Sequence, residues 1–172
     1  MAKLTVGVVF GGRSVEHEVS LVSAKSVISN TDKDKYEVFP IFIDKEGIWR
    51  RASIDAWLDG GELDVETGSF LTPSLGSGGP LLYEIADGKP AAEHKIDVIF
   101  PVLHGTFGED GTVQGLFELM GVPFVGAGVL GSSVGMDKIM MKAVLKDSGL
   151  PVPEFVGFYK HEWEADRNGV AI

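Results

Sequence analysis

The chain contains no cysteine, and this absence excludes several kinds of chemistry. Without cysteine there are no disulfide bonds, no thiolate ligands for zinc and no cysteine nucleophile. Basic residues are also few, since 15 Lys and Arg stand against 25 Asp and Glu and give a net charge of −10. Because this charge repels phosphate backbones, nucleic acid is not an expected partner.

Long apolar runs and targeting signals are missing as well. No stretch reaches the roughly 18 apolar residues that a membrane span requires, so we expect no membrane insertion. The N-terminus enters a strand-like run directly and has no signal-peptide pattern, which favours a cytoplasmic location.

What the sequence does contain favours an α/β fold. Its 172 residues and 44% hydrophobic content suit one full domain with little left over. Short, nearly continuous apolar runs at 4–10, 38–43 and 96–103 are typical of strands buried in a parallel sheet. Helical segments alternate with them, and this pattern predicts an open, mainly parallel sheet with helices on both faces. In such sheets, ligands bind beyond the carboxyl ends of the strands.

The first helix is expected to start after Ser14. Leu21, Ala24 and Ile28 share one helical face, and Asn30 can end the helix. The clearest helical pattern follows the run at 96–103, where apolar residues recur at i, i+3, i+4 and i+7.

That second helix is expected to span Val113 to Met120. Asp110 or Thr112 can serve as its N-cap, and Gly121 can end it.

The rest of the chain gives weaker signals. We expect a short strand at 122–125, a helix over 136–143 ended by Gly149, and a strand at 154–160. Residues after 160 begin an amphipathic segment that the chain does not complete, as expected for the front part of a longer protein.

Three other features of the sequence favour irregular or peripheral structure. Pro40 lies inside the run at 38–43 and favours an edge strand or a bulge. The acidic stretch 44–68 is expected to be a solvated surface, and the Gly- and Ser-rich segment 68–80 a mobile loop.

The first candidate site is the segment GGRSVEHEVS at 11–20, between the first strand and its helix. Two glycines allow a sharp turn, and the helix N-terminus favours anionic groups. Glu16 could therefore face a ligand, although Glu16 and Glu18 could equally complement the helix dipole. The segment is not a Walker loop, because the required lysine is absent.

The second candidate site is HGTFGEDGTVQG at 104–115, between the third strand and the clearest helix. His104 directly follows a buried strand, where side chains point into the ligand crevice of such folds. The alternatives are a structural histidine at His104 and simple capping by Glu109 and Asp110.

Two further motifs lie near the C-terminal end. GAGVLG at 126–131 fits a dinucleotide fingerprint, but it is not in a first βαβ unit, so we interpret it as an interdomain turn instead of a dehydrogenase site. Lys138 occupies the first turn of a helix, where the dipole disfavours a cation unless an anion is bound. The other histidines lack partners at metal-ligand spacing, and we expect no metal site.

Three segments, read in order, resemble the D-alanine:D-alanine ligase family of the ATP-grasp superfamily. They are GGRSVEHEVS, LHGTFGEDGTVQGLFELMGVPFVGAGVLGSSVGMDK and GLPVPEF, and the resemblance covers nearly the whole chain except the variable stretch 44–90. It implies an N-terminal, Rossmann-like substrate-binding domain at 1–126, and the start of an incomplete central ATP-grasp domain at 127–172.

The resemblance also implies a reaction, in which ATP phosphorylates one D-alanine carboxylate and the amino group of a second D-alanine attacks it. Glu16 matches the residue that receives the ammonium of the first D-alanine, and His104 matches one near the reacting carboxylate. Lys138 matches a lysine that contacts ATP phosphate. Mg²⁺ would neutralise the phosphates, and its ligands would lie outside this chain. The family further implies a homodimer that serves peptidoglycan precursor synthesis.

Alternatives to this function remain at the level of sequence. The second substrate could be D-lactate or D-serine instead of D-alanine, because the residues that select it lie largely beyond 172. The chain could also be a non-catalytic binding or dimerisation module derived from the ligase domain. By itself the 172-residue chain is expected to be inactive.

Overall fold

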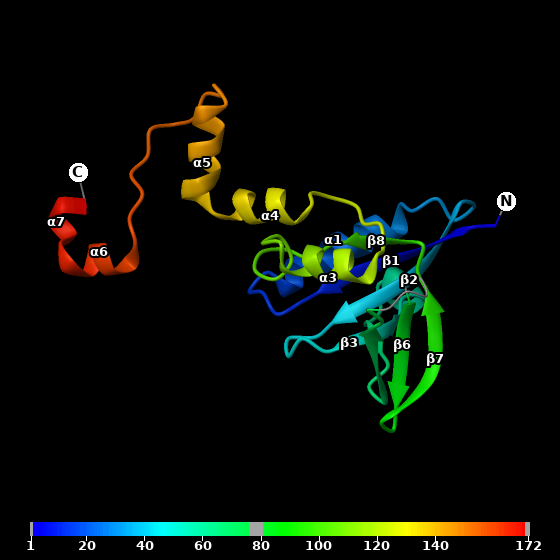
Figure 1. The fold of residues 1–172 in the computed structure, drawn as a ribbon. Coiled ribbons are helices and arrows are strands. Elements are labelled where there is room, and N and C mark those ends of the chain that lie inside the picture. The colour runs from blue at the N-terminus through cyan, green and yellow to red at the C-terminus, as the bar shows by residue number, and fades with distance from the viewer. Residues whose placement is uncertain (1, 76–80, 171–172) are drawn as a thin grey trace. The chain divides into compact units, whose positions relative to one another are not determined.

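The computed structural model describes residues 2–75 and 81–170 and divides the chain into two compact units, Met1–Ser133 and Val134–Ile172 (Figure 1). The strands are β1 (Leu4–Gly11), β2 (Tyr36–Ile43), β3 (Trp49–Ser53), β4 (Asp64–Val65), β5 (Ser69–Pro73), β6 (Leu81–Ala86), β7 (Lys89–Lys95) and β8 (Val98–Pro101). The helices are α1 (His17–Ser29), α2 (Asp55–Leu58), α3 (Thr112–Met120), α4 (Val129–Met136), α5 (Lys138–Asp147), α6 (Lys160–Ala165) and α7 (Arg167–Val170).

The main sheet has the strand order β4-β3-β2-β1-β8. β1 runs parallel to both β2 and β8, with Val8 opposite Pro40 on one side and Phe100 on the other. The predicted α/β fold with a mainly parallel central sheet is therefore confirmed. β3 and β4 extend the sheet in antiparallel pairing, which the sequence analysis did not predict.

One face of this sheet packs against α1 and α2. Ala24 and Ile28 of α1 are buried here, as the helical spacing predicts. Phe10 of β1 stacks on Trp57 of α2, with ring centroids 5.6 Å apart. α1 ends at Ser29 with Asn30 as its C-cap, which confirms the predicted stop.

The opposite face packs against α3. Phe117 is fully buried and Met120 nearly so, and both belong to one core cluster with residues of β1, β2 and β8. The helix ends at Gly121, whose φ of 66° is the left-handed conformation that glycine adopts without strain. The predicted position of this helix is confirmed.

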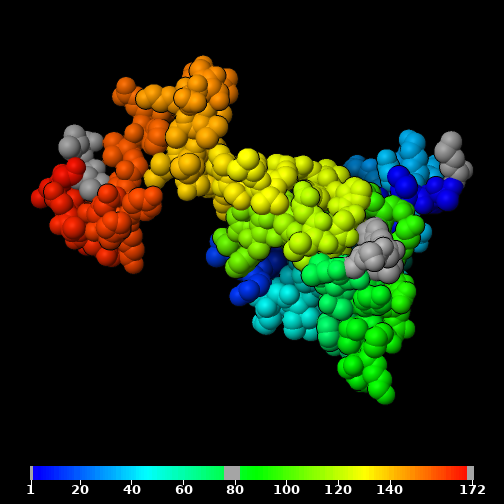
Figure 2. All heavy atoms as spheres, viewed as in Figure 1, coloured from blue at the N-terminus to red at the C-terminus, as the bar shows by residue number. Residues whose placement is uncertain are grey.

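The acidic stretch 44–68 was wrongly interpreted as entirely solvated, because it contains β3, α2 and β4 and buries Trp57. A second, three-stranded antiparallel sheet of β5, β6 and β7 follows, and its Leu71 and Leu82 join the α3 core cluster. Figure 2 shows β6 and β7, in green, projecting from the first unit. The predicted loop at 68–80 is thus partly a strand, and its residues 76–80 lie outside the described residues.

Pro40 does not mark an edge strand, since β2 lies between β1 and β3. The residues of β2 that pair with β3 are Ile41 to Ile43, so Pro40 lies just beyond the antiparallel pairing and no ladder bond to β3 is lost there. The strand expected at 122–125 is reduced to one parallel bridge between Ile99 and Phe124.

The C-terminal predictions were only partly correct. The helix expected over 136–143 is interrupted at Asp137, because its carboxylate accepts hydrogen bonds from the backbone N–H groups of Ile139 and Met140 at 3.0 Å and caps a new helix, α5. Residues 154–159 form no strand, so that prediction was wrong. None of the helices within 2–75 and 81–170 has the length and apolar character that crossing a bilayer demands.

Candidate functional site

The candidate site lies where β1 and β8 end side by side. These neighbouring strands are parallel, so the loops that follow them emerge at the same edge of the sheet. The backbone N–H of Val102 donates to the carbonyl of Val9 at 2.7 Å and continues this pairing past the end of β8. The two candidate segments, 11–20 and 104–115, therefore meet at this edge.

The turn after β1 needs its two glycines. Gly11 and Gly12 have φ values of +89° and +95°, and a side chain on Gly11 would overlap the carbonyl oxygen of Ile43. The N–H of Gly12 donates to that same carbonyl at 2.8 Å. The turn directs the chain from β1 into α1 and sets the position of Glu16.

Glu16 is exposed and occupies the residue immediately before α1. Its N–H donates to Ser14 Oγ at 2.9 Å, and its carboxylate lies against Gly105, where an added Cβ would overlap Glu16 Oε2. Among the described residues, this carboxylate accepts no hydrogen bond and makes no side-chain cap.

Glu18 differs from Glu16 in this respect. Its carboxylate pairs with Lys45 Nζ at 2.9 Å, and this hydrogen bond lowers the pKa of Glu18 below its usual range. Of these two carboxylates, that of Glu16 is thus the one without a partner within residues 2–75 and 81–170, and it is available to bind a ligand at the sheet edge.

His104 is half-buried in the loop that follows β8, and its Nε2 lies 2.9 Å from the Oγ of Ser23 in α1. Its neighbour Gly105, at a φ of +69°, faces the Glu16 carboxylate. The structure therefore brings the segments of Glu16 and His104 together, although their roles toward a substrate stay a prediction.

Acidic residues hold the rest of this loop in shape. Glu109 accepts a hydrogen bond from the N–H of Gly105 at 2.7 Å, and Asp110 accepts from the N–H groups of Phe107 at 2.8 Å and Thr112 at 3.0 Å. Burial acts to raise the pKa of Asp110, but these hydrogen bonds outweigh it and the pKa is lowered. Gly111, not Asp110 or Thr112, is the N-cap residue of α3, and Asp110 bonds to its first turn from one position earlier.

Lys138 belongs to the second unit and is described within that unit alone. It is the first residue of α5, is exposed, and donates to the carbonyl of Gly135 at 3.3 Å. Within the described part of the chain it has no carboxylate partner. Glu16 and His104 belong to the other unit, Met1–Ser133.

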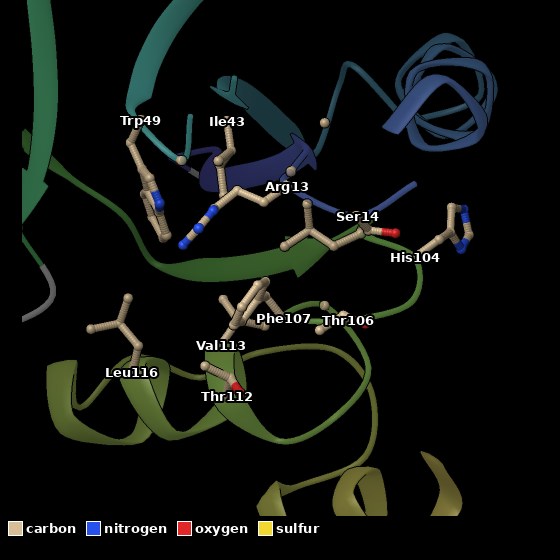
Figure 3. A pocket seen from close by; sticks show the side chains of 15 residues that line it. Arg13, Ser14, Ile43, Trp49, His104, Thr106, Phe107, Thr112, Val113 and Leu116 are labelled. Carbon is tan, nitrogen blue, oxygen red and sulfur yellow. The ribbon is translucent and has the colours of Figure 1, made fainter. Parts of the chain in front are cut away.

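A cavity of about 190 Å³ lies at the same sheet edge. Its walls are largely apolar and come from β2, β3, the loop after β8, and α3, and they include Ile43, Trp49, Leu103 and Val113. Figure 3 shows Arg13 among these side chains, with His104 at the opposite end of the labelled group from Trp49.

The Arg13 guanidinium lies 5.1 Å from the centre of the Phe107 ring, a cation–π contact. Sequence reasoning did not identify Arg13, Phe107 or Trp49 as site residues. Trp49 in particular lies in a stretch that its charged neighbours mark as surface.

The described residues do not fit a metal site, because they hold no group of three or more His, Asp or Glu side chains that could bind an ion together. Lys138 could contact a phosphate as a point charge.

Comparison with known proteins agrees with the geometry. Residues 5–127 match the family model described as D-ala D-ala ligase N-terminus. The D-alanine–D-alanine ligase of Natranaerobius thermophilus is 48% identical over 172 residues, which cover 99% of this chain and 46% of that protein.

Solved structures give the same result. A D-Ala:D-Ser ligase, VanG from Enterococcus faecalis, matches with a TM-score of 0.77 and 34% identity over 95% of this chain and 47% of that one. A D-alanine–D-alanine ligase from Bacillus anthracis, solved with ATP, matches with a TM-score of 0.59 and 29% identity over 92% and 42%.

The chain spans about half the length of the curated relatives it matches. Since the family model covers most of the chain, including both site segments, the chain belongs to the D-alanine–D-alanine ligase family and corresponds to its N-terminal part.

Proposed function

We propose that the full-length protein containing this chain is an ATP-dependent ligase that joins two D-alanines. The observation that carries the proposal is the exposed, unpaired carboxylate of Glu16 beside the loop of His104, at the ligand-binding edge of the sheet. Family membership and the names of the relatives support the same activity.

Glu16 would bind the ammonium group of the first D-alanine. Its carboxylate has no partner among the described residues, so binding a cation breaks no existing ion pair. A charge-assisted hydrogen bond of this kind contributes about 1.5–3 kcal/mol. This contact would orient the carboxyl end of the amino acid toward the reacting position.

His104 would act on the carboxylate of the same D-alanine. An imidazole donor positioned there can hold the substrate and stabilise charge that develops on the carboxyl oxygens. Because Nε2 is engaged by Ser23, Nδ1 is the nitrogen available for this contact.

ATP would supply the phosphoryl group that activates the carboxylate, and Mg²⁺ would neutralise the phosphates. Lys138 would contact a phosphate, which gives its cation the anionic partner that the helix N-terminus favours. The Mg²⁺ ligands would come from parts of the protein outside this chain.

The proposal includes a domain organisation and an assembly. Residues 1–126 would form the substrate-binding domain, residues 127–172 would begin the central domain, and two copies would form a homodimer in the cytoplasm. The division of the chain between Ser133 and Val134 and the family match to 5–127 support a boundary in this region.

The test is an assay of the full-length protein with ATP, Mg²⁺ and D-alanine, in which the products are identified by mass spectrometry. The proposal expects D-alanyl-D-alanine, with one ADP per dipeptide. Parallel reactions with added D-serine or D-lactate test the second substrate, for which the similarity to the D-Ala:D-Ser ligase supports an alternative. Absence of any ligated product would refute the proposal and favour a non-catalytic module.

A further inference from the structure

Ser23 stands out because it links the two candidate segments through a single side chain. It lies on the second turn of α1, seven residues after Glu16, and its Oγ is 2.9 Å from His104 Nε2. Both residues are partly buried, so water competes less for this hydrogen bond than at an open surface.

The contact spans 81 positions in sequence and joins α1 to the loop after β8. Helix α1 is held in place independently, because its Ala24 and Ile28 are buried against the sheet. The hydroxyl of Ser23 is therefore a stable anchor point for the imidazole of His104.

We propose that Ser23 is a positioning residue, which holds the His104 ring by Nε2 and selects the tautomer with the proton on Nδ1. A serine hydroxyl can donate to an unprotonated ring nitrogen, and the hydrogen bond at one imidazole nitrogen decides which nitrogen carries the proton. With Nε2 accepting from Ser23, the neutral ring keeps Nδ1–H as a donor. This arrangement gives the proposed substrate carboxylate a hydrogen-bond donor without requiring a charged imidazolium.

The role of Ser23 in catalysis rests on the proposed function, because it acts only through His104. Replacement by Ala removes the hydroxyl and leaves the ring free to turn and to adopt the Nε2–H tautomer, which is the favoured form of free histidine. We expect Ser23→Ala in the full-length protein to lower kcat/KM for D-alanine about tenfold, because one hydrogen bond to the His104 ring is lost. The KM for ATP should be unchanged.

The same helix offers a matched control. Ser26 is exposed on α1, and its side chain has no hydrogen-bond partner among the described residues. Ser26→Ala changes helix propensity in the same way as Ser23→Ala and should leave the kinetics unchanged. Ser23→Thr keeps the hydroxyl and should restore most of the activity.

A direct readout of the tautomer separates this inference from the proposed function. With ¹⁵N-histidine labelling of the full-length protein, and His104→Gln to assign the signal, we expect the Nδ1–H form of His104 at neutral pH and a shift toward Nε2–H in Ser23→Ala. An unchanged tautomer in Ser23→Ala would overturn the inference, whether or not the protein ligates D-alanine. A protein that shows the shift but no ligation would refute only the proposed function.

An altered tautomer with unchanged kcat/KM in an active enzyme would also overturn the positioning role. A urea unfolding curve for each variant checks that the effects do not come from lost stability.

Discussion

Gly105 decides how closely the loop after β8 can approach Glu16. Its φ of +69° is a conformation that other residues adopt only with strain, and a Cβ would lie 2.8 Å from Ser14 Oγ and would overlap the Glu16 carboxylate. A carboxylate at the end of a flexible side chain can move away at little cost. A side chain at position 105 should therefore displace the Glu16 carboxylate and leave the fold largely intact.

We expect Gly105→Ala to raise the KM for D-alanine in the full-length protein, because the carboxylate proposed to bind the ammonium group is moved. The matched control is Gly88→Ala, which has nearly the same φ, +70°, but open space around the added methyl group. Both variants should lose about 1–2 kcal/mol of stability from the backbone conformation. If the two variants bind D-alanine equally well, the close approach of Gly105 to Glu16 has no functional role.

Individual residues also mark the limit of what the sequence predicts. Glu16 and His104 were identified because each follows a buried strand in a glycine-containing loop, a local pattern. Ser23 and Trp49 carry no such signal, since their contacts come from packing of segments distant in sequence. Arg13 lies in the same loop as Glu16, but its contact with Phe107 comes from the distant loop after β8. The sequence likewise does not tell which of the two carboxylates, Glu16 or Glu18, has a partner; in the structure Lys45 pairs with Glu18.

At the scale of elements, the side chain of Ser20 in α1 connects this helix to the end of β1 and to the residue that follows β8. Its fully buried Oγ donates to the carbonyl of Val102 after β8 and accepts from the N–H of Gly11 in β1, so α1 ties the two parallel strands together at the site.

We expect Ser20→Ala to destabilise the protein by about 1–3 kcal/mol, because it leaves two buried backbone groups without this partner. Urea unfolding measures the effect, with Ser26→Ala as the control for the same substitution at an exposed position of α1. A difference of less than a few tenths of a kcal/mol between the two variants would contradict this role.

The β5-β6-β7 sheet has its own polar cluster. The hydroxyl of Ser69 donates to Glu84 at 2.8 Å, and His94 lies 3.0 Å from the other carboxylate oxygen. The hydrogen bond from Ser69, then that from His94, lowers the pKa of Glu84 below its ordinary 4.5.

A lowered carboxyl pKa contributes stability above its unfolded-state value and loses it as the pH falls through the folded-state value. We therefore expect Glu84→Gln to be less stable than the parent at neutral pH and to lose less stability on acidification below about pH 5. Melting temperatures measured from neutral to acidic pH test this, with the exposed Glu93→Gln on β7 as the control. Parallel pH curves for the parent and Glu84→Gln would show that the cluster contributes nothing.

The predictability of elements followed the strength of their periodic patterns. β1, α1 and α3 were predicted because continuous or helically spaced apolar residues dominate them. β3, α2 and the β5-β6-β7 sheet were missed because each buries only a few residues among charged neighbours. The break between α4 and α5 depends on capping by Asp137, which a pattern of apolar spacing does not report.

At the scale of the whole molecule, this chain corresponds to the N-terminal part of the D-alanine–D-alanine ligase family. The first unit carries Glu16 and His104, the second carries Lys138, and the chain covers about 46% of a full-length relative. Glu16, whose proposed role is to bind the ammonium group of the first D-alanine, is among the residues that this chain itself provides.

The most direct test is therefore the kinetics of Glu16→Gln in the full-length protein, beside Glu18→Gln as the control. Glu18 lies on the first turn of α1, two residues after Glu16, but pairs with Lys45 at the surface. We expect Glu16→Gln to raise the KM for D-alanine about 10- to 100-fold with the KM for ATP unchanged, and Glu18→Gln to behave as the parent. Unchanged KM and kcat for D-alanine in Glu16→Gln would contradict the central claim.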